Sequence, residues 1–293
     1  MTTGGFVVYT EAMTQRDQAA RSAAKTSSRR RALELLALIV LVLGCERAEP
    51  KADAAQSAEP ELVVFAAASL RDVFTQLGKR FEAAHPGSRV IFNFAGTQEL
   101  RTQLQQGARA DVFASADQKH MADLVKASLV SEAVLFARNE PVIVVAKDSV
   151  GRIRTFADVP NADRIVLGAP DVPIGRYALQ ILDRAAASYG ADYRARVEAK
   201  VVSRELNVRQ VLAKVTLGEA ELAFVYRSDA AAAAGRATVV KIPADVNVIA
   251  DYPIATLKEA PHPILARAWV ELVLAPEGQR ALEAAGFLPR GAT

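Results

Sequence analysis

From residue 61 to the C-terminus, short apolar runs alternate with stretches in which apolar residues recur at helical spacing. The first run, LVVFAA at 62–67, is suited to a buried strand. The next apolar residues follow at helical intervals: Leu70, Val73, Phe74, Leu77 and Phe81. Repetition of this strand and helix order predicts an α/β architecture, with mainly parallel sheets flanked by helices.

The same patterns predict the remaining elements. Further strands are predicted at 90–94, 112–114, 141–146, 165–167, 200–202, 222–225 and 248–256. Further helices are predicted at 98–106, 118–126, 177–189, 208–217, 228–234, 263–274 and 276–285. Sheets of this kind bind ligands at the carboxyl ends of their strands, where helix N-termini offer unpaired N–H groups to an anion.

The N-terminal part predicts an export signal. Residues 29–31 are all arginine, and residues 32–44 are apolar apart from Glu34. Thirteen residues are too few for a membrane-spanning helix, which needs about 20. A basic run followed by a short apolar segment and small residues is typical of a signal peptide, here at 1–44, and a buried core helix is the weaker alternative.

The single cysteine of the chain, Cys45, directly follows Val42-Leu43-Gly44. This segment resembles a bacterial lipobox, in which the cysteine is lipidated and becomes the mature N-terminus. The alternative is a plain secretory signal with a chance cysteine. Residues 45–60 are rich in Ala, Glu, Lys and Asp without an apolar period, which predicts a flexible tether. We therefore expect an exported protein, held to the membrane only by a lipid at Cys45.

The net charge of +3 is concentrated in the predicted signal peptide. Residues 1–44 hold six basic and three acidic residues, which leaves 30 of each in the rest of the chain. A neutral folded part disfavours nucleic-acid binding, which needs a basic surface.

Polar or small residues stand where several predicted strands lead into helices. Ser69 follows AAA at 66–68, Thr97 follows Ala95-Gly96, and Asn207-Val208 opens a helix; Ile174 lies within DVPIGRY at 171–177, and Tyr226 ends a strand. Each position alone also fits a structural role. Ser69 and Thr97 are possible helix caps, Pro173 and Gly175 possible turn residues, and Tyr226 a possible core aromatic.

Taken together, four segments resemble the periplasmic molybdate-binding proteins of ABC importers: VFAAASL, ADVFASAD, VPIGRYA and FVYRSDA. The resemblance spans about residues 62–287. It implies a two-lobed, hinge-linked periplasmic-binding-protein fold of type II. Lobe 1 would comprise 61–139 and 251–293, and lobe 2 would comprise 140–250.

The resemblance also implies a site made of neutral donors. Ser69 and Thr97 would supply hydroxyl and N–H groups, Ile174 and Val208 backbone N–H groups, and Tyr226 its phenolic hydroxyl. Many family members have serine at the position of Thr97, and a smaller residue at that of Ile174. Molybdate, and with it tungstate, would be the ligand, bound as an oxyanion without a cofactor. A monomer would deliver it to an ABC permease.

Donors without a full positive charge can bind a buried dianion when all its oxygens are hydrogen-bonded. A donor-only site disfavours an anion that carries its own O–H, such as hydrogen phosphate. Sulfate remains an alternative ligand, since cavity size decides between it and molybdate. An organic carboxylate also remains open, because Arg176, Arg209 and Arg227 each lie next to a predicted site position.

Other classes of function fit less well. The three histidines, His85, His120 and His262, belong to no nucleophile or metal-spacing motif, so surface roles and no catalysis are expected. Asp111 and Asp117 resemble turn and cap residues. A ferric site would use paired tyrosines, and only Tyr226 is near the expected pocket. The effector half of a transcription regulator is disfavoured by the signal peptide and the lack of a DNA-binding domain.

Overall fold

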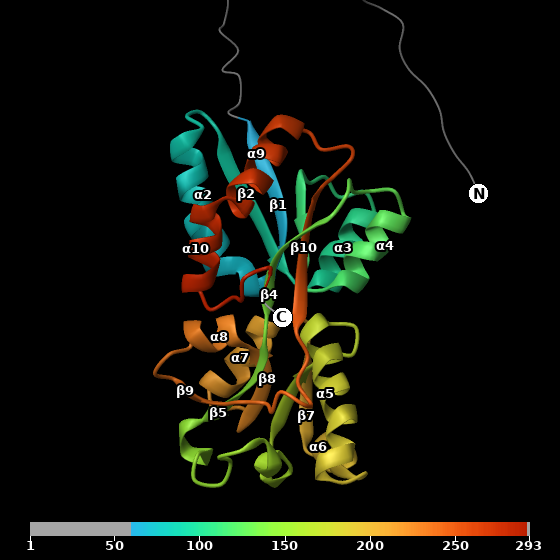
Figure 1. Cartoon of the computed structure of the whole chain (residues 1–293), viewed down its shortest axis with the longest axis vertical. Helices are drawn as coiled ribbons and strands as arrows, with labels where there is room; N and C mark the ends of the chain where they lie inside the picture. Colours follow the sequence, from blue (N-terminus) through green and yellow to red (C-terminus); the bar gives the residue numbers. More distant parts are fainter. Residues whose placement is uncertain (1–59, 292–293) are drawn as a thin grey trace, which may run out of the picture. The chain divides into compact units, whose positions relative to one another are not determined.

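The computed structural model describes residues 60–291. The predicted signal peptide at 1–44, Cys45 and the tether up to residue 59 lie outside the described residues. The described part falls within one compact unit that contains two five-stranded sheets (Figure 1). Between residues 60 and 291, no helix has both the length and the apolar character needed to cross a membrane.

The first sheet has the strand order β2-β1-β3-β10-β4. Its strands are β1 (Glu61–Ala67), β2 (Arg89–Ala95), β3 (Val112–Ala114), β4 (Val134–Asn139) and β10 (Ala250–Thr256). β1 runs parallel to β2 and β3, whereas β10 runs antiparallel to β3 and β4. A strand from the C-terminal part of the chain is thus inserted between strands that precede residue 140.

Helices cover both faces of the first sheet. Helices α2 (Arg71–Ala84), α9 (Pro263–Leu274) and α10 (Pro276–Ala284) pack together on one face, and α3 (Thr97–Gln105) and α4 (Gln118–Lys126) on the other. The alternation of β1 directs Val64 into the first cluster and Phe65 into the second. In the first cluster, the rings of Phe74 and Trp269 meet edge to face with centroids 5.4 Å apart.

The second sheet has the order β7-β6-β8-β5-β9. Its strands are β5 (Pro141–Ala146), β6 (Ile165–Gly168), β7 (Val201–Glu205), β8 (Leu222–Tyr226) and β9 (Ala237–Val240). Its helices are α5 (Pro173–Tyr189), α6 (Tyr193–Glu198), α7 (Val208–Thr216) and α8 (Arg227–Ala232). Helices α5 and α6 lie on one side of the sheet, and α7 and α8 on the other (Figure 1). Three 3-10 helices complete the described part: η1 (Ala68–Leu70), η2 (Lys147–Ser149) and η3 (Phe156–Asn161).

Two segments of the chain connect the sheets. A single residue, Glu140, separates β4 of the first sheet from β5 of the second, and residues 241–249 lead back from β9 to β10. We call the first sheet with its helices lobe 1, and the second sheet with its helices lobe 2. The carboxyl ends of β1, β2, β6 and β8 all lead toward the boundary between the lobes.

The predicted α/β architecture with mainly parallel sheets is confirmed. Each sheet contains one reversed strand, β10 in the first and β5 in the second, and both are the first strands after a crossing. The sequence patterns missed β4, β9 and α6. β4 was missed because it is separated from β5 by one residue and so merges with it into one mixed stretch. β9 is short and half exposed, and α6 has only six residues.

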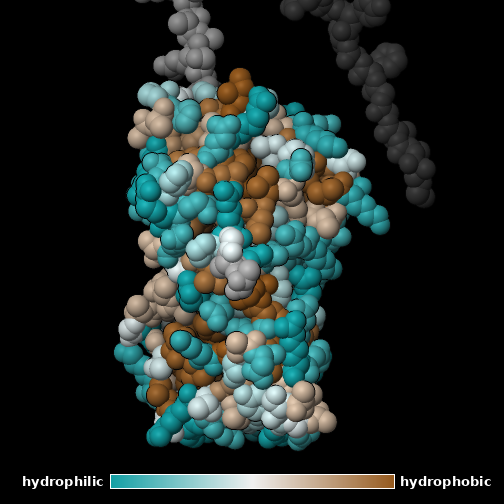
Figure 2. All heavy atoms as spheres, in the orientation of Figure 1, coloured by the Kyte–Doolittle hydropathy of each residue, from teal (hydrophilic) through white to brown (hydrophobic). Residues whose placement is uncertain are grey.

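Polar residues dominate the outer surface. Figure 2 shows hydrophilic side chains over most of one face, with smaller hydrophobic patches between them. The most exposed large hydrophobic residues, Ile264 and Leu217, belong to different lobes. The apolar residues of the repeated strand and helix pattern therefore lie mainly in the interior of the lobes.

Candidate anion-binding site

A small pocket lies between the lobes. All five residues that the sequence singled out line it: Ser69 and Thr97 from lobe 1, and Ile174, Val208 and Tyr226 from lobe 2. The other lining residues are small, apolar or amide-bearing: Ala67, Ala68, Ala95, Gly96, Ala116, Val172, Pro173 and Asn207. No residue of this lining carries a formal charge, so a ligand here would meet only neutral groups.

Helix starts converge on the pocket. Thr97 is the first residue of α3, Val208 is the first of α7 and Ile174 is the second of α5. Ser69 lies in η1, which continues directly into α2, and Tyr226 immediately precedes α8. The first N–H groups of a helix have no partner within it, and the helix dipole places partial positive charge there. The pocket is therefore suited to an anion.

Asn207 leaves the N–H group of Val208 free for a ligand. The Oδ1 atom of Asn207 accepts hydrogen bonds from the N–H groups of Arg209 and Gln210, at 3.0 and 3.1 Å. This N-cap satisfies the second and third donors of α7 and leaves the first, Val208, facing the pocket. On α5, Pro173 fills the first position and has no N–H, so Ile174 supplies the first donor of that helix.

Thr97 presents a hydroxyl hydrogen that no protein group of the described chain accepts. Its Oγ1 atom accepts a hydrogen bond from the N–H of Ala116 at 3.2 Å. The N-cap of α3 is Gly96, so Thr97 is not a helix cap. A hydroxyl that already accepts one bond can donate its own hydrogen to a ligand.

Ser69 is also not a helix cap. Its Oγ atom lies 3.0 Å from the hydroxyl of Tyr252, a buried residue of β10. The capping role that its position also allowed is therefore replaced by a contact with a distant strand.

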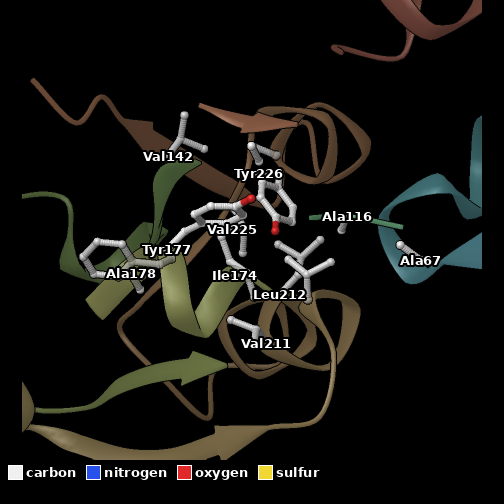
Figure 3. Close-up of a cluster of buried hydrophobic side chains, with 14 of the residues drawn as sticks. Ala67, Ala116, Val142, Ile174, Tyr177, Ala178, Val211, Leu212, Val225 and Tyr226 are labelled. Atoms are coloured by element: carbon white, nitrogen blue, oxygen red, sulfur yellow. The ribbon is translucent and has the colours of Figure 1, made fainter. Parts of the chain in front are cut away.

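Tyr226 has a buried hydroxyl without a hydrogen-bond partner among the described residues. Burial, reinforced by the neighbouring Tyr252, raises the pKa of its phenol well above the usual value, so the group stays protonated and can donate. Figure 3 shows its ring beside Tyr177 and near Ile174, whereas Ala67 of lobe 1 lies farther from the ring and lines the same pocket. An unpaired buried hydroxyl is costly, and a ligand oxygen in the pocket would satisfy it.

Gly175 allows the start of α5 to approach the end of β6. A Cβ at this position would lie 2.2 Å from the carbonyl oxygen of Ala169 and 2.4 Å from that of Gly168. A larger residue would push α5, and the Ile174 donor with it, away from the sheet.

Charged residues join the lobes around the pocket but do not line it. Arg209 of lobe 2 lies 2.7 Å from Asp72 of lobe 1, and its Nε lies 2.7 Å from Asp229 of its own lobe. Arg227 donates to the carbonyl oxygens of Gly286 and Phe287.

The third arginine, Arg176, bonds to Asp117 across the lobes. An organic carboxylate was a possible ligand because three arginines lie next to predicted site positions. In the structure, each of these arginines is bonded to a group of the protein itself. None of them lines the pocket formed by the described residues, which disfavours a carboxylate clamp.

The expected surface role of His120 is wrong. This histidine is fully buried, and its Nε2 lies 2.9 Å from the carbonyl oxygen of Asp171 in the other lobe. Asp117 caps α4 as expected, but it also pairs with Arg176, which the sequence did not indicate. Between residues 60 and 291, no cluster of three or more His, Cys, Asp and Glu residues is suited to a metal ion.

Sequence reasoning missed Tyr252 and Asn139. Both are fully buried, at the two strands that border the crossings between the lobes. The only signal was the polar residue itself, a tyrosine and an asparagine in strands that are mostly apolar.

Known proteins resemble this chain in sequence and in fold. A family model described as "Bacterial extracellular solute-binding protein" matches residues 62–288. The chain is 43% identical over 228 residues to the molybdate-binding protein ModA of Mycobacterium tuberculosis, covering 77% of this chain and 84% of that protein.

Two solved structures share the fold. One is the periplasmic molybdate-binding protein of Azotobacter vinelandii, with a TM-score of 0.68 and 21% identity over 78% of this chain and 98% of that one. The other is the sulfate-binding protein SubI of M. tuberculosis, with a TM-score of 0.71 and 19% identity over 78% and 87%. At these identities the likeness concerns the fold alone.

Proposed function

The chain belongs to the bacterial extracellular solute-binding proteins, and we propose that it captures molybdate between its lobes for delivery to an ABC importer. The ModA relative, 43% identical over most of both chains, supports molybdate as the ligand. The observation that carries the proposal is the pocket lined by uncharged donors at helix starts, with the unpaired hydroxyl of Tyr226 inside it.

This donor set suits a tetrahedral dianion. Ser69, Thr97 and Tyr226 offer hydroxyl groups, and Ile174 and Val208 offer N–H groups at helix ends. Charge-assisted hydrogen bonds offset the cost of removing an anion from water. With donors on both lobes, a bound anion would hold the lobes together, and a permease could recognise that closed form.

The ligand choice rests on two properties of the pocket. A site that offers hydrogen-bond donors and no acceptor disfavours hydrogen phosphate, because the O–H group of that anion would be left without a partner. Molybdate, tungstate and sulfate bring none, so the size of the pocket must separate them. We therefore include tungstate as a second ligand, and sulfate remains the second candidate because of the shared fold with SubI.

The remaining parts of the proposal concern the protein's place in the cell. We expect periplasmic or cell-envelope residence with a lipid at Cys45, a monomer, and neither catalysis nor a cofactor.

The lobe boundaries predicted from the sequence, 61–139 with 251–293 and 140–250, are part of the same proposal. They are supported by the membership of the strands in the two sheets.

Isothermal titration of the purified protein with molybdate, tungstate, sulfate and phosphate tests the proposed function. We expect tight binding of the first two and much weaker binding of the others. Sulfate binding as tight as molybdate binding would contradict the assignment.

A further inference from the structure

The hydroxyl of Ser69 meets a chain of buried polar side chains that leads to the crossing between the lobes. Ser69 Oγ lies 3.0 Å from the Tyr252 hydroxyl, and Asn139 Nδ2 lies 3.5 Å from that same hydroxyl. Asn139 is the last residue of β4, directly before Glu140. None of these three side chains is more than 3% exposed.

The backbone fixes the orientation of the Asn139 amide. The N–H of Glu140 donates to Asn139 Oδ1 at 3.0 Å. An N–H group needs an acceptor, so the carbonyl oxygen of the amide must be on this side. The amide nitrogen is therefore directed to the other side, where it donates to Ser228 Oγ at 2.8 Å and meets the Tyr252 hydroxyl at the longer distance.

The direction of the next bond follows from this orientation. Asn139 Nδ2 has only hydrogens to offer, so the Tyr252 oxygen is on the accepting side of that contact. Burial raises the pKa of Tyr252 well above its usual value, so its hydroxyl keeps its hydrogen. The Tyr252 hydroxyl therefore donates its hydrogen bond to Ser69 Oγ. The hydroxyl hydrogen of Ser69 is then available to donate to a ligand in the pocket.

We propose that Tyr252, oriented by Asn139, is a positioning residue that holds Ser69 as a donor toward the bound anion. This inference rests on the proposed function, because it concerns the same pocket. It adds a means of selection: a serine held as a donor cannot turn to accept a hydrogen bond from a protonated anion. Neither Tyr252 nor Asn139 lines the pocket, so both act through Ser69.

The test is a double-mutant cycle with Ser69→Ala and Tyr252→Phe, measured by isothermal titration. Tyr252→Phe should weaken molybdate binding about tenfold, as expected when a hydrogen bond to a charged group loses its alignment. In the Ser69→Ala background, the same change should have little further effect, because the serine through which Tyr252 acts is gone.

The selectivity between molybdate and hydrogen phosphate gives a second measurement, which should not change if Tyr252 has only a structural role. Without Tyr252, the Ser69 hydroxyl can rotate and accept, so binding of hydrogen phosphate should weaken less than binding of molybdate. The ratio of the two dissociation constants should therefore narrow in Tyr252→Phe.

Tyr193→Phe is the matched control. Tyr193 is also buried, and its hydroxyl donates to the carbonyl oxygen of Phe156 in lobe 2, away from the pocket. This variant should lose stability without any change in affinity or selectivity.

The outcomes separate the inference from the proposed function. Titration of the unmodified protein with four anions tests the function, and the cycle is run with whichever anion binds most tightly. Equal binding by Tyr252→Phe and the unmodified protein would overturn the positioning role. Additive losses of affinity for Ser69→Ala and Tyr252→Phe in the double-mutant cycle would also overturn it. So would an equal loss of molybdate binding and of hydrogen phosphate binding in Tyr252→Phe.

Discussion

Arg176 of α5 places Nη2 2.5 Å from Oδ2 of Asp117, and so joins lobe 2 to lobe 1 beside the pocket. The carboxylate is fully buried and the guanidinium is one quarter exposed. Asp117 also accepts the N–H of His120 at 2.9 Å, so the same residue starts α4 and contacts the other lobe. An ion pair in this position depends on the lobes being together.

Replacing the arginine should therefore weaken anion binding. In Arg176→Met the closed form would bury Asp117 without its partner, which typically costs a few kcal/mol. We expect the dissociation constant for molybdate to rise roughly tenfold or more. Arg196→Met is the control, because its pair with Asp192 is exposed on both sides and lies within lobe 2. Equal affinities of the two variants in isothermal titration would show that the Arg176 pair does not contribute to closure.

Gly96→Ala should block the approach of the lobes without disturbing either fold. The backbone of Gly96 (φ −63°, ψ 138°) is one that alanine adopts readily. A Cβ there would lie 2.2 Å from the carbonyl oxygen of Leu206 in the other lobe. We expect a loss of affinity of at least tenfold with an unchanged melting temperature.

Gly151→Ala is the matched control, since nothing lies within 4 Å of a Cβ at that position. Titration and thermal unfolding of both variants test the prediction. Unchanged affinity in Gly96→Ala would mean that the close approach to Leu206 is not needed for binding.

Tyr226→Phe should separate stability from binding. The hydroxyl of Tyr226 has no partner among the described residues, so its removal breaks no hydrogen bond of the protein itself. The unliganded variant should be as stable as the unmodified protein, or more stable. Its affinity for molybdate should fall by roughly 1.5–3 kcal/mol, the typical contribution of a hydrogen bond to a charged group.

Tyr177→Phe serves as the comparison, because its ring lies 6.4 Å from that of Tyr226 but Tyr177 does not line the pocket. Urea unfolding and titration of the two variants give the two quantities. A loss of stability without a loss of affinity in Tyr226→Phe would contradict the proposed donor role.

Asp229 should make the stability of the unliganded protein depend on pH. Complete burial raises its pKa from 3.8 to about 6, and the nearby Arg209 only partly offsets this. Arg209 Nε is close to the carboxylate, but its N–H is not aligned for a hydrogen bond. The folded state therefore holds the proton of Asp229 more tightly than the unfolded state does.

The sign of the effect follows from this difference. The free energy of unfolding should fall as the pH rises from about 4 to above 6, by an amount on the order of 2 kcal/mol from this group. Asp229→Asn should lose this part of the pH dependence. Urea unfolding at pH 4 and pH 7 measures it, and the idea fails if both proteins lose the same stability between the two.

The residues that line the pocket were predicted from the resemblance to a known family, and local patterns added only that several of them stand at the starts of helices. Gly96-Thr97 and Asn207-Val208 mark such starts by local chemistry, and the structure brings both to one pocket. Local patterns also predicted most strands and helices, although α5 begins four residues before the predicted residue 177, at Pro173. These features depend on neighbours in the chain.

The contacts that support the pocket could not be predicted in this way. Ser69 and Tyr252 are 183 residues apart, and Arg209 and Asp72 are 137 apart. His120 has the sequence surroundings of a surface residue, but it is fully buried and contacts Asp171 of lobe 2. Such contacts are set by the arrangement of the two lobes, which no local pattern contains.

The insertion of β10 into the middle of the first sheet has a consequence for the order of folding. All strands of lobe 2 belong to one uninterrupted stretch, so that lobe can complete its sheet as soon as β9 is available. Lobe 1 must wait for residues 250–256, and until then β3 and β4 lack the strand that joins them. An incomplete chain therefore carries unpaired strand edges, which favour aggregation. Truncations that end before Thr256 should accumulate as insoluble protein, although most of their sequence is intact.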